Sequence, residues 1–356
     1  MRVAVDGRSL RTAAPARGVS VYLECLLAEL RRTCPEDRFE PVVDGRVSRV
    51  AAAAVGRPRL DRLAGGCDVV WAPAPAPLAV SAGVPFVLTL HDLSFEHRPA
   101  DYSRYERIWH RAARPRRLAR DAARVIAVSE AVRGQAIAEW ALDPERVVTV
   151  LSGPGRPPGP VGPLPGGLEP GFVLAVGALE PRKRPRLLIE AHERARERGL
   201  RAELVFAGAG DPPRSARDSS PAARGPRGDA SASLGARFLG RVDDPTLEAL
   251  YRGALVLACP SREEGFGFTP LEAAARGTPS VVPALPPFGE TLGDAAIAVT
   301  PGDAGSLADA LVRIEREPDL RNRLAAAALD AAARLSWERT ARETRAVLAA
   351  AAEGAR

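Results

Sequence analysis

The sequence predicts an α/β protein made of two doubly wound, Rossmann-like domains, and three observations support this fold class. Short apolar runs alternate with helical stretches, which is the pattern of parallel sheets covered by helices on both faces. The alternation is interrupted at residues 152–171, where seven prolines and seven glycines among twenty residues exclude a strand or helix. With 356 residues, the chain is long enough for two domains with separate cores.

The first predicted domain covers residues 1–151. It begins with a strand over Met1–Asp6, a loop over Gly7–Gly18 and a helix over Val19–Arg32. Five further apolar runs have the length and composition of buried strands. These runs are Phe39–Val43, Val69–Trp71, Val84–Leu90, Val125–Val128 and Val147–Leu151. Residues 152–171 form the predicted linker.

The second predicted domain covers residues 172–336 and repeats the pattern, with a strand over Phe172–Val176 and a helix over Pro185–Arg198. Further strands are predicted over Ala202–Ala207, Arg237–Leu239, Ala254–Cys259, Ser280–Val282 and Ala295–Val299. Further helices are predicted over Pro245–Tyr251, Ser306–Glu317 and Asp319–Leu335. A last helix, residues 337–356, is predicted after this domain and begins at Trp337. The stretch Asp211–Gly235 is rich in Pro, Arg, Ser and Gly without a period, so we expect a mobile surface loop.

Composition limits the class of protein. The net charge is +6, but no zinc-finger, RNA-binding or helix-turn-helix pattern accompanies it, so nucleic acid is not an expected partner. No apolar run reaches the roughly eighteen residues of a membrane span, and the N-terminus reads as a strand rather than a signal peptide. Cys25, Cys34, Cys67 and Cys259 lack metal-ligand spacing. We expect reduced thiols in a cytoplasmic protein.

One stretch, Ser261–Pro279, combines a strand end, a glycine loop and a helix start. Gly265 and Gly267 let the backbone approach a ligand closely, and the N-terminus of a helix favours phosphate. Thr269 is the predicted N-cap and Pro270 the first helical residue. The pattern therefore predicts a site for a phosphate-containing ligand.

Two carboxylates flank this loop, Glu264 before the glycines and Glu272 in the predicted first helical turn. Both are acceptors for hydroxyl groups, so together they could hold the two ends of a nucleotide sugar. An alternative stays open. Thr269 and Glu272 have the spacing of a capping box, which would explain Glu272 without any ligand.

The run that begins at Glu264, Glu-Gly-Phe-Gly-Phe-Thr-Pro-Leu-Glu-Ala-x-Ala-x-Gly-Thr-Pro, resembles the Glu-x7-Glu signature of family 4 retaining glycosyltransferases. Four other stretches match the family in the same order. The resemblance extends from Met1 to about Leu348 and is weak at residues 212–235. It implies the GT-B fold, in which two Rossmann-like domains face a central cleft, the first binding the acceptor and the second the nucleotide sugar. In this fold the C-terminal helix, residues 337–356, returns towards the first domain.

The resemblance also implies roles for residues of the second domain. Glu264 would orient the transferred sugar and Glu272 the ribose. Arg182 and Lys183, in Val-Gly-Ala-Leu-Glu-Pro-Arg-Lys-Arg-Pro, would stabilise the departing diphosphate, whose charge grows in the transition state. Lys183 is the only lysine in the sequence, although a solvated basic turn is the alternative. The remaining donor-binding positions would be Gly265, Phe266, Gly267, Phe268, Thr269 and Arg241.

In the first domain, Leu-Thr-Leu-His-Asp-Leu resembles the loop that faces the donor sugar. His91 would lie near the reacting centre, and Asp92, on the acceptor side, would hold its tautomer or cap the loop. Gly18 opens Gly-Val-Ser-Val-Tyr, which is similar to the family's entry to the first helix and adds a donor-binding position.

Two weaker matches lie in the second domain. The loop of Arg241 meets the nucleobase in relatives, although Asp243 and Asp244 serve equally well as N-caps. Glu290 matches a frequent glutamate beside the donor, although the two prolines at 286 and 287 indicate an ordinary turn.

The resemblance implies a retaining enzyme that moves a hexosyl group, mannosyl as the first hypothesis, from a GDP-, UDP- or dTDP-linked sugar to a hydroxyl acceptor in glycan, glycolipid or natural-product biosynthesis. No metal or other cofactor is expected, since the basic pair and the helix end would act in place of a cation and no Asp-x-Asp triplet is present. The alternatives are a nucleotide-sugar epimerase on the same fold, or a catalytically silent nucleotide-sugar-binding partner that regulates an active transferase.

The segment Arg104–Arg124 is rich in arginine, with Tyr105 and Trp109 interspersed. It is either a solvated face or, as in relatives with lipid-linked acceptors, a peripheral contact with anionic membrane at the inner face.

Overall fold

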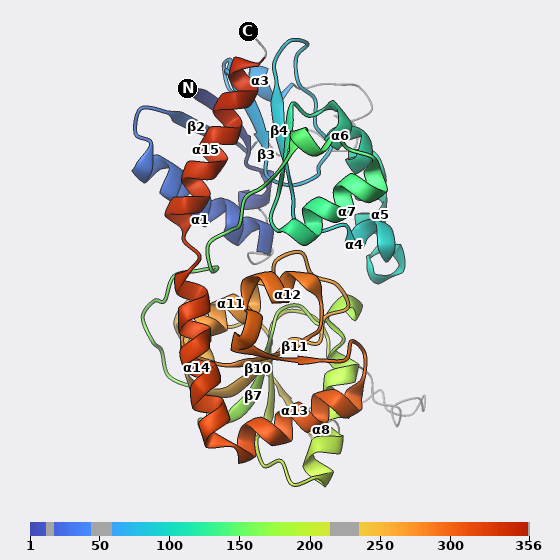
Figure 1. Cartoon of the computed structure of the whole chain (residues 1–356), viewed down its shortest axis with the longest axis vertical. Helices are drawn as coiled ribbons and strands as arrows, with labels where there is room; N and C mark the ends of the chain where they lie inside the picture. Colours follow the sequence, from blue (N-terminus) through green and yellow to red (C-terminus); the bar gives the residue numbers. More distant parts are fainter. Residues whose placement is uncertain (12–17, 44–58, 214–234, 355–356) are drawn as a thin grey trace. The chain divides into compact units, whose positions relative to one another are not determined.

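The computed structural model describes residues 1–11, 18–43, 59–213 and 235–354, and the chain divides into two compact units (Figure 1). Unit 1 comprises Met1–Arg156 and Leu335–Arg356, and unit 2 comprises Pro157–Arg334. Each unit contains one six-stranded sheet in which every strand pair is parallel. The predicted α/β class with two doubly wound sheets is therefore confirmed, whereas the predicted extent of the linker stays a prediction.

The sheet of unit 1 has the order β2-β1-β3-β4-β5-β6. Its strands are β1 (Arg2–Asp6), β2 (Arg38–Val42), β3 (Val69–Ala72), β4 (Phe86–Leu90), β5 (Arg124–Ala127) and β6 (Val147–Thr149). The chain runs outward from β1 to β2 and then returns to the other side of β1 for β3. The strand order therefore reverses between β1 and β3, which is where open parallel sheets bind ligands.

The longer helices of unit 1 are α1 (Gly18–Thr33), α5 (Arg104–Ala113), α6 (Pro115–Asp121), α7 (Glu130–Trp140) and α15 (Trp337–Glu353). Single turns are η1 (Arg8–Arg11), α3 (Leu60–Leu63), α4 (Ser94–His97), η2 (Pro99–Asp101) and η3 (Pro144–Arg146). The C-terminal helix α15 packs against α1 and strands β3, β4 and β5 of this unit. The predicted last helix is thus present from Trp337.

Aromatic side chains fill the core of unit 1 beside α15. Tyr22 and Trp71 are fully buried, and the Tyr22 ring lies edge-on to both Trp71 and Trp337. Trp337 Nε1 donates to the Gly155 carbonyl at 2.8 Å. The Trp337 ring covers Gly153 so closely that a Cβ there would come within 2.5 Å of it. Glycine at 153 is therefore a packing requirement.

The sheet of unit 2 has the order β12-β11-β10-β7-β8-β9. Its strands are β7 (Phe172–Val176), β8 (Leu204–Ala207), β9 (Ala236–Phe238), β10 (Ala254–Ala258), β11 (Ser280–Pro283) and β12 (Ala296–Val299). Because β8 and β9 extend from one side of β7 and β10 lies on the other, the order reverses between β7 and β10.

The helices of unit 2 are α8 (Pro185–Glu197), α10 (Asp244–Gly253), α11 (Phe268–Ala274), α12 (Pro286–Thr291), α13 (Ala304–Arg316) and α14 (Pro318–Ala333), with turns η4 (Pro181–Lys183) and η6 (Gly293–Ala295). One core cluster joins α8 and α13 to the sheet, and a second joins α10 and α11 to it. Helix pairs α8/α13 and α10/α11 thus bury the apolar residues of the unit.

Some predicted bounds are wrong for identifiable reasons. Strand β8 begins at Leu204, two residues late, because the N–H groups of Arg201 and Ala202 donate to the Glu315 carboxylate instead of a neighbouring strand. The predicted turn before Glu290 is helix α12, since proline is tolerated in the first helical turn. Of the predicted mobile loop, residues 214–234 lie outside the described residues. Among the described residues, no helix is long and apolar enough to cross a bilayer.

Candidate functional site

Two loops meet where the strand order of unit 2 reverses. The loop after β7 covers residues 177–184 and the loop after β10 covers residues 259–267, so both start from the same edge of the sheet. A backbone hydrogen bond of 2.8 Å from Arg262 N to Arg182 O joins them. Behind the first loop, a Cβ on Gly208 would lie 1.9 Å from the Gly177 carbonyl oxygen. Close backbone packing therefore fixes the strand ends from which the loops depart.

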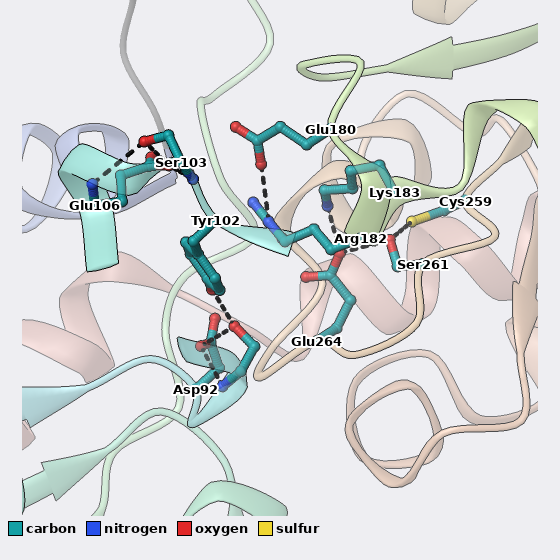
Figure 2. A network of polar contacts seen from close by, with 11 residues as sticks. Asp92, Tyr102, Ser103, Glu106, Glu180, Arg182, Lys183, Cys259, Ser261 and Glu264 are labelled. Atoms are coloured by element: carbon teal, nitrogen blue, oxygen red, sulfur yellow. Dashed lines mark hydrogen bonds and ion pairs between the residues drawn. The ribbon is translucent and has the colours of Figure 1, made fainter. Parts of the chain in front are cut away.

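Lys183 and Glu264 form an ion pair between these two loops (Figure 2). Ser261 Oγ donates to the same carboxylate oxygen, Glu264 Oε1, at 2.8 Å, and Cys259 Sγ lies 3.4 Å from that hydroxyl. The side chains of Lys183 and Glu264 are only 21% and 13% exposed. The sequence places the pair 81 positions apart, and the sheet brings it together.

The ion pair fixes the charge of both groups. Burial raises the pKa of Glu264, but attraction to Lys183 and Arg182 outweighs burial and holds that pKa below its ordinary value. Burial lowers the pKa of Lys183, but attraction to Glu264 outweighs burial and raises that pKa. Both groups are consequently ionised near neutral pH. Arg182 also has a partner on its own loop, because its Nε donates to Glu180 Oε2 at 2.9 Å (Figure 2).

The glycine loop begins α11 differently from the prediction. The N-cap is Gly267, with φ of +89°, so Thr269 is the second residue inside the helix. The predicted N-cap at Thr269 is therefore wrong. The Phe288 ring presses on Gly267, where a Cβ would come within 2.7 Å of it, so glycine is required there. Phe266 is buried and its ring lies 5.2 Å from that of Phe268, which anchors the loop.

Glu272 has a partner that the sequence pattern does not reveal. Tyr251, at the end of α10, donates its hydroxyl to Glu272 Oε2 at 2.8 Å. Burial and the Glu272 charge raise the pKa of Tyr251 well above its ordinary value, so the phenol stays a donor. Arg276 lies over the Tyr251 ring at 5.3 Å and pairs with the buried Glu248 at 2.7 Å. Without a cap at Thr269, the capping-box explanation of Glu272 is also wrong.

The other predicted positions of unit 2 lie on other segments of the chain than these two loops. Arg241 is exposed and follows Gly240, whose φ is +65°. Asp243 is the N-cap of α10, accepting from Thr246 N at 2.9 Å, whereas Asp244 is already helical, so only the Asp243 cap is confirmed. Glu290 is an exposed residue of α12.

His91 follows β4 in unit 1 and has a defined tautomer. Its Nε2 lies 2.8 Å from the Pro73 carbonyl oxygen, and because a carbonyl can only accept, Nε2 carries the proton. Nδ1 is then an acceptor. The Tyr22 ring stands edge-on at 4.8 Å. Burial lowers the pKa of His91, so the ring is neutral at neutral pH.

Asp92 caps its loop rather than holding the His91 tautomer, so the two predicted alternatives are resolved. Asp92 Oδ1 accepts from Ser94 N at 3.0 Å and from Ser94 Oγ at 2.6 Å. The Ser94 hydroxyl also contacts the Tyr102 hydroxyl. The predicted position Gly18 is the first residue of α1, one turn before Tyr22.

The described residues contain one group that could hold a metal by proximity alone, Cys34, Glu36 and Asp37. The Asp37 carboxylate already pairs with the Met1 ammonium and with Arg345 Nε, each at 2.7 Å. Glu36 also pairs with Arg345. We therefore interpret this group as an ion-pair cluster that attaches α15 to the chain start. All four cysteines are free thiols, as predicted.

Comparison with known proteins identifies the class. The family model described as "Glycosyltransferase Family 4" matches residues 9–153, and "Glycosyl transferases group 1" matches residues 166–330. D-inositol 3-phosphate glycosyltransferase of Frankia alni is 32% identical over 291 residues, covering 76% of this chain and 70% of that protein. O-antigen chain mannosyltransferase B of Escherichia coli is 29% identical over 272 residues, covering 72% and 68%.

Solved structures show the same fold. Sucrose-phosphate synthase from Thermosynechococcus elongatus matches with a TM-score of 0.69 at 18% identity, covering 98% of each chain. HepE from Anabaena, in complex with UDP-glucose, matches with a TM-score of 0.69 at 18% identity, covering 98% of this chain and 99% of that one. These neighbours have the GT-B fold, and the chain is a glycosyltransferase. It belongs to glycosyltransferase family 4, as the signature beginning at Glu264 predicted.

Proposed function

We propose that this glycosyltransferase is a retaining enzyme that moves a hexosyl group, mannosyl as the first hypothesis, from a nucleotide diphosphate sugar to a hydroxyl acceptor. The observation that carries the proposal is the Lys183–Glu264 pair, held where the strand order of unit 2 reverses. Two relatives support the substrate classes. HepE was solved with UDP-glucose, and the Escherichia coli relative is named a mannosyltransferase.

In this proposal the donor extends along the two loops of unit 2. Lys183 and Arg182 stabilise the diphosphate, which gains negative charge as the glycosidic bond breaks. Glu264 accepts hydrogen bonds from hydroxyls of the transferred sugar, and Glu272 accepts them from the ribose. Gly265 and Gly267 allow the backbone to approach the donor. Because Lys183 and Glu264 hold each other in the same geometry, both roles depend on one ion pair.

The first domain would supply hydrogen bonds to the reacting sugars. His91 donates from Nε2 to Pro73, so its Nδ1 is the atom left to accept from a sugar hydroxyl. A neutral imidazole is not a strong base, and we assign the acceptor proton to the leaving phosphate oxygen. Retention follows if the acceptor attacks the face of the sugar from which the diphosphate departs. No metal is required, because Lys183 and Arg182 stabilise the leaving group.

Two alternatives lead to different products. An epimerase would convert one nucleotide sugar into another without releasing the nucleoside diphosphate, and a silent regulatory partner would bind the donor and leave it unchanged. A panel of UDP-, GDP- and dTDP-sugars, with and without acceptor alcohols and with chelator present, distinguishes these outcomes. We expect slow release of nucleoside diphosphate from one donor, and binding without release would refute the enzymatic role.

Lys183→Ala tests the site itself. We expect turnover to fall by about two to three decades, the scale of losing one preorganised charge. Because Glu264 loses its partner while retaining Ser261, the melting temperature should fall as well. Arg186→Ala is the matched control, since it removes an exposed cation from α8, the helix that follows the same loop. Turnover that is unchanged in Lys183→Ala would contradict the diphosphate role.

We also propose peripheral contact with anionic membrane through α5. This helix buries only Ala113, whereas Tyr105 and Ile108 are 66% and 54% exposed beside several arginines. Exposed apolar side chains flanked by cations suit a lipid headgroup region. Replacing both residues with serine should reduce sedimentation with phosphatidylglycerol-containing vesicles, while donor hydrolysis in solution stays unchanged. Equal sedimentation of the variant and the parent would refute this contact.

A further inference from the structure

A cavity of about 460 Å³ in unit 1 lies at the amino ends of β4 and β5. Phe86 begins β4 and Arg124 begins β5, and both line the cavity together with the C-terminal end of α15. His91 follows the carboxyl end of β4, so the cavity is at the opposite end of the strands from His91. Its volume is within the usual range of small-molecule sites. The cavity is therefore separate from the residues to which we assign the transfer reaction.

Most of the cavity wall is apolar. The apolar residues precede or begin β4 or lie at the end of α15, namely Val80, Val84, Pro85, Phe86, Ala350 and Ala351. Ser81 also lines the cavity, and its backbone N–H donates to Asp61 Oδ1 at 2.9 Å. The Ser81 side chain is buried, and its Oγ has no hydrogen-bond partner in the described parts of the chain. A ligand with an organic group would cover the apolar wall and remove it from water.

Two arginines of the lining lie side by side on neighbouring strands. Val125 of β5 and Val147 of β6 are register partners, and Arg124 and Arg146 stand at the positions directly before them. Like charges on adjacent strands repel each other. Among the described residues, neither guanidinium group is paired with a carboxylate. An anion between the two guanidinium groups would remove this repulsion.

Backbone carbonyls hold both guanidinium groups at the cavity. Arg124 Nη1 donates to the Ala123 carbonyl at 3.1 Å. Arg146 Nη2 donates to the Arg120 carbonyl at 2.9 Å and also to the Ala122 carbonyl, at the end of α6. These bonds use only part of the donors that a guanidinium group offers. The remaining N–H groups are consequently held in place to bind an anion.

The lining contains one carboxylate, Asp121, which does not compensate these arginines. Asp121 pairs with Arg117 on the same helix, α6, at 3.4 Å. The Asp121 side chain is 59% exposed, so water and salt screen its charge. The two guanidinium groups and one carboxylate leave the lining with an excess of one positive charge.

We propose that this cavity binds a small aliphatic carboxylic acid, with the carboxylate between Arg124 and Arg146 and the aliphatic chain against Val84, Phe86 and the end of α15. The two oxygens of a carboxylate match the paired N–H groups of a guanidinium group. Its single negative charge balances the excess charge of the lining, whereas a phosphate monoester would reverse it. Binding at this site does not depend on the transfer reaction proposed above.

Calorimetric titration of the full chain at low ionic strength compares three probes. Hexanoate carries both the carboxylate and the aliphatic chain, hexan-1-ol has the chain without the charge, and acetate has the charge with only a methyl group. We expect hexanoate to bind about tenfold or more tightly than either of the other two, because only hexanoate uses both the guanidinium groups and the apolar wall.

Two variants test the two halves of the site. Arg124→Gln removes one of the adjacent charges, and Arg342→Gln is its matched control, because it removes an exposed charge from α15 outside the cavity. Ala350→Leu fills the cavity from an exposed position of α15, and leucine is a good helix former. Ala346→Leu is its matched control, because it makes the same change at an exposed position of α15 that does not line the cavity.

We expect Arg124→Gln and Ala350→Leu to bind hexanoate about tenfold more weakly than the parent, and the two controls to bind it nearly as the parent does. A melting curve for each variant shows that folding is retained. If the parent does not bind hexanoate, or binds hexan-1-ol equally well, the guanidinium pair is not a carboxylate site. If either variant binds hexanoate as tightly as its control does, the carboxylic acid does not occupy this cavity.

Discussion

Tyr251→Phe tests whether the donor site depends on a residue outside the Glu-x7-Glu run. The substitution retains the buried ring and removes only the hydroxyl that donates to Glu272 Oε2 at 2.8 Å. If Tyr251 positions Glu272 for a ribose, the variant should bind the donor nucleotide more weakly although Tyr251 itself touches no ligand. A purely structural Tyr251 would lower stability and leave donor affinity unchanged.

The size of the effect follows from the contact. A hydrogen bond to a charged group contributes about 1.5 to 3 kcal/mol net, and the half-buried Glu272 can recover part of this from water. We therefore expect a loss of about 1 to 2 kcal/mol in the free energy of unfolding. For donor binding, loss of the contact that positions Glu272 should cost about 1 kcal/mol, or roughly fivefold in Kd.

The assay is calorimetric titration of nucleoside diphosphate into the parent, Tyr251→Phe, Glu272→Gln and the double variant. Coupling of the two substitutions in donor affinity would show that they act through one contact. Thr269→Ala is the control. Because the N-cap is Gly267, the Thr269→Ala substitution should change the melting temperature little, whereas removing a capping side chain would lower the free energy of unfolding by about 1 kcal/mol. If Glu272→Gln weakens binding and Tyr251→Phe does not, the positioning role is refuted.

Two further predictions concern stability. Gly153→Ala places a Cβ within 2.5 Å of the Trp337 ring, so we expect the free energy of unfolding, measured with denaturant, to fall by about 1 to 3 kcal/mol. Gly159→Ala is the control, because nothing lies within 4 Å of its added Cβ, and it should change this free energy little. Equal effects of the two substitutions would contradict the packing role of Gly153. Burial lowers the pKa of His91, His110 and His192 below 6.5. Between about pH 7 and pH 5 the unfolded chain therefore binds more protons than the folded chain, and the free energy of unfolding should decrease as the pH falls. A free energy of unfolding that stays constant or increases as the pH falls would contradict this.

The sheets were predictable because their signal is local. Runs such as Val69–Trp71 and Phe172–Val176 are apolar throughout, as strands buried on both faces must be, and the break between the two sheets coincides with residues no strand or helix accommodates. The candidate residues near the reversal of β7 and β10 were also predictable, since glycines, carboxylates and cations follow strand ends. The contacts that these residues make with one another could not be predicted. Lys183 and Glu264 meet only because parallel strands bring distant loops to one edge.

Local signals also misled at two points. Thr-Pro is an ordinary N-cap and first-turn pair, and nothing near Thr269 in the sequence indicates that the Phe288 ring covers Gly267 and begins the helix earlier. Tyr251 lies on a different helix from Glu272, so no spacing rule joins them.

The single lysine of the sequence gives the enzyme an unusual chemical property. An amine-directed reagent has one side-chain target among 356 residues, and that target lies between the two loops that we propose to hold the donor. Attraction to Glu264 raises the pKa of Lys183, so the amine stays protonated and reacts slowly with acylating reagents. A faster rate of labelling would therefore indicate that the ion pair with Glu264 has broken. Mass spectrometry of one peptide could then follow occupancy of the site without a radioactive substrate or an engineered probe.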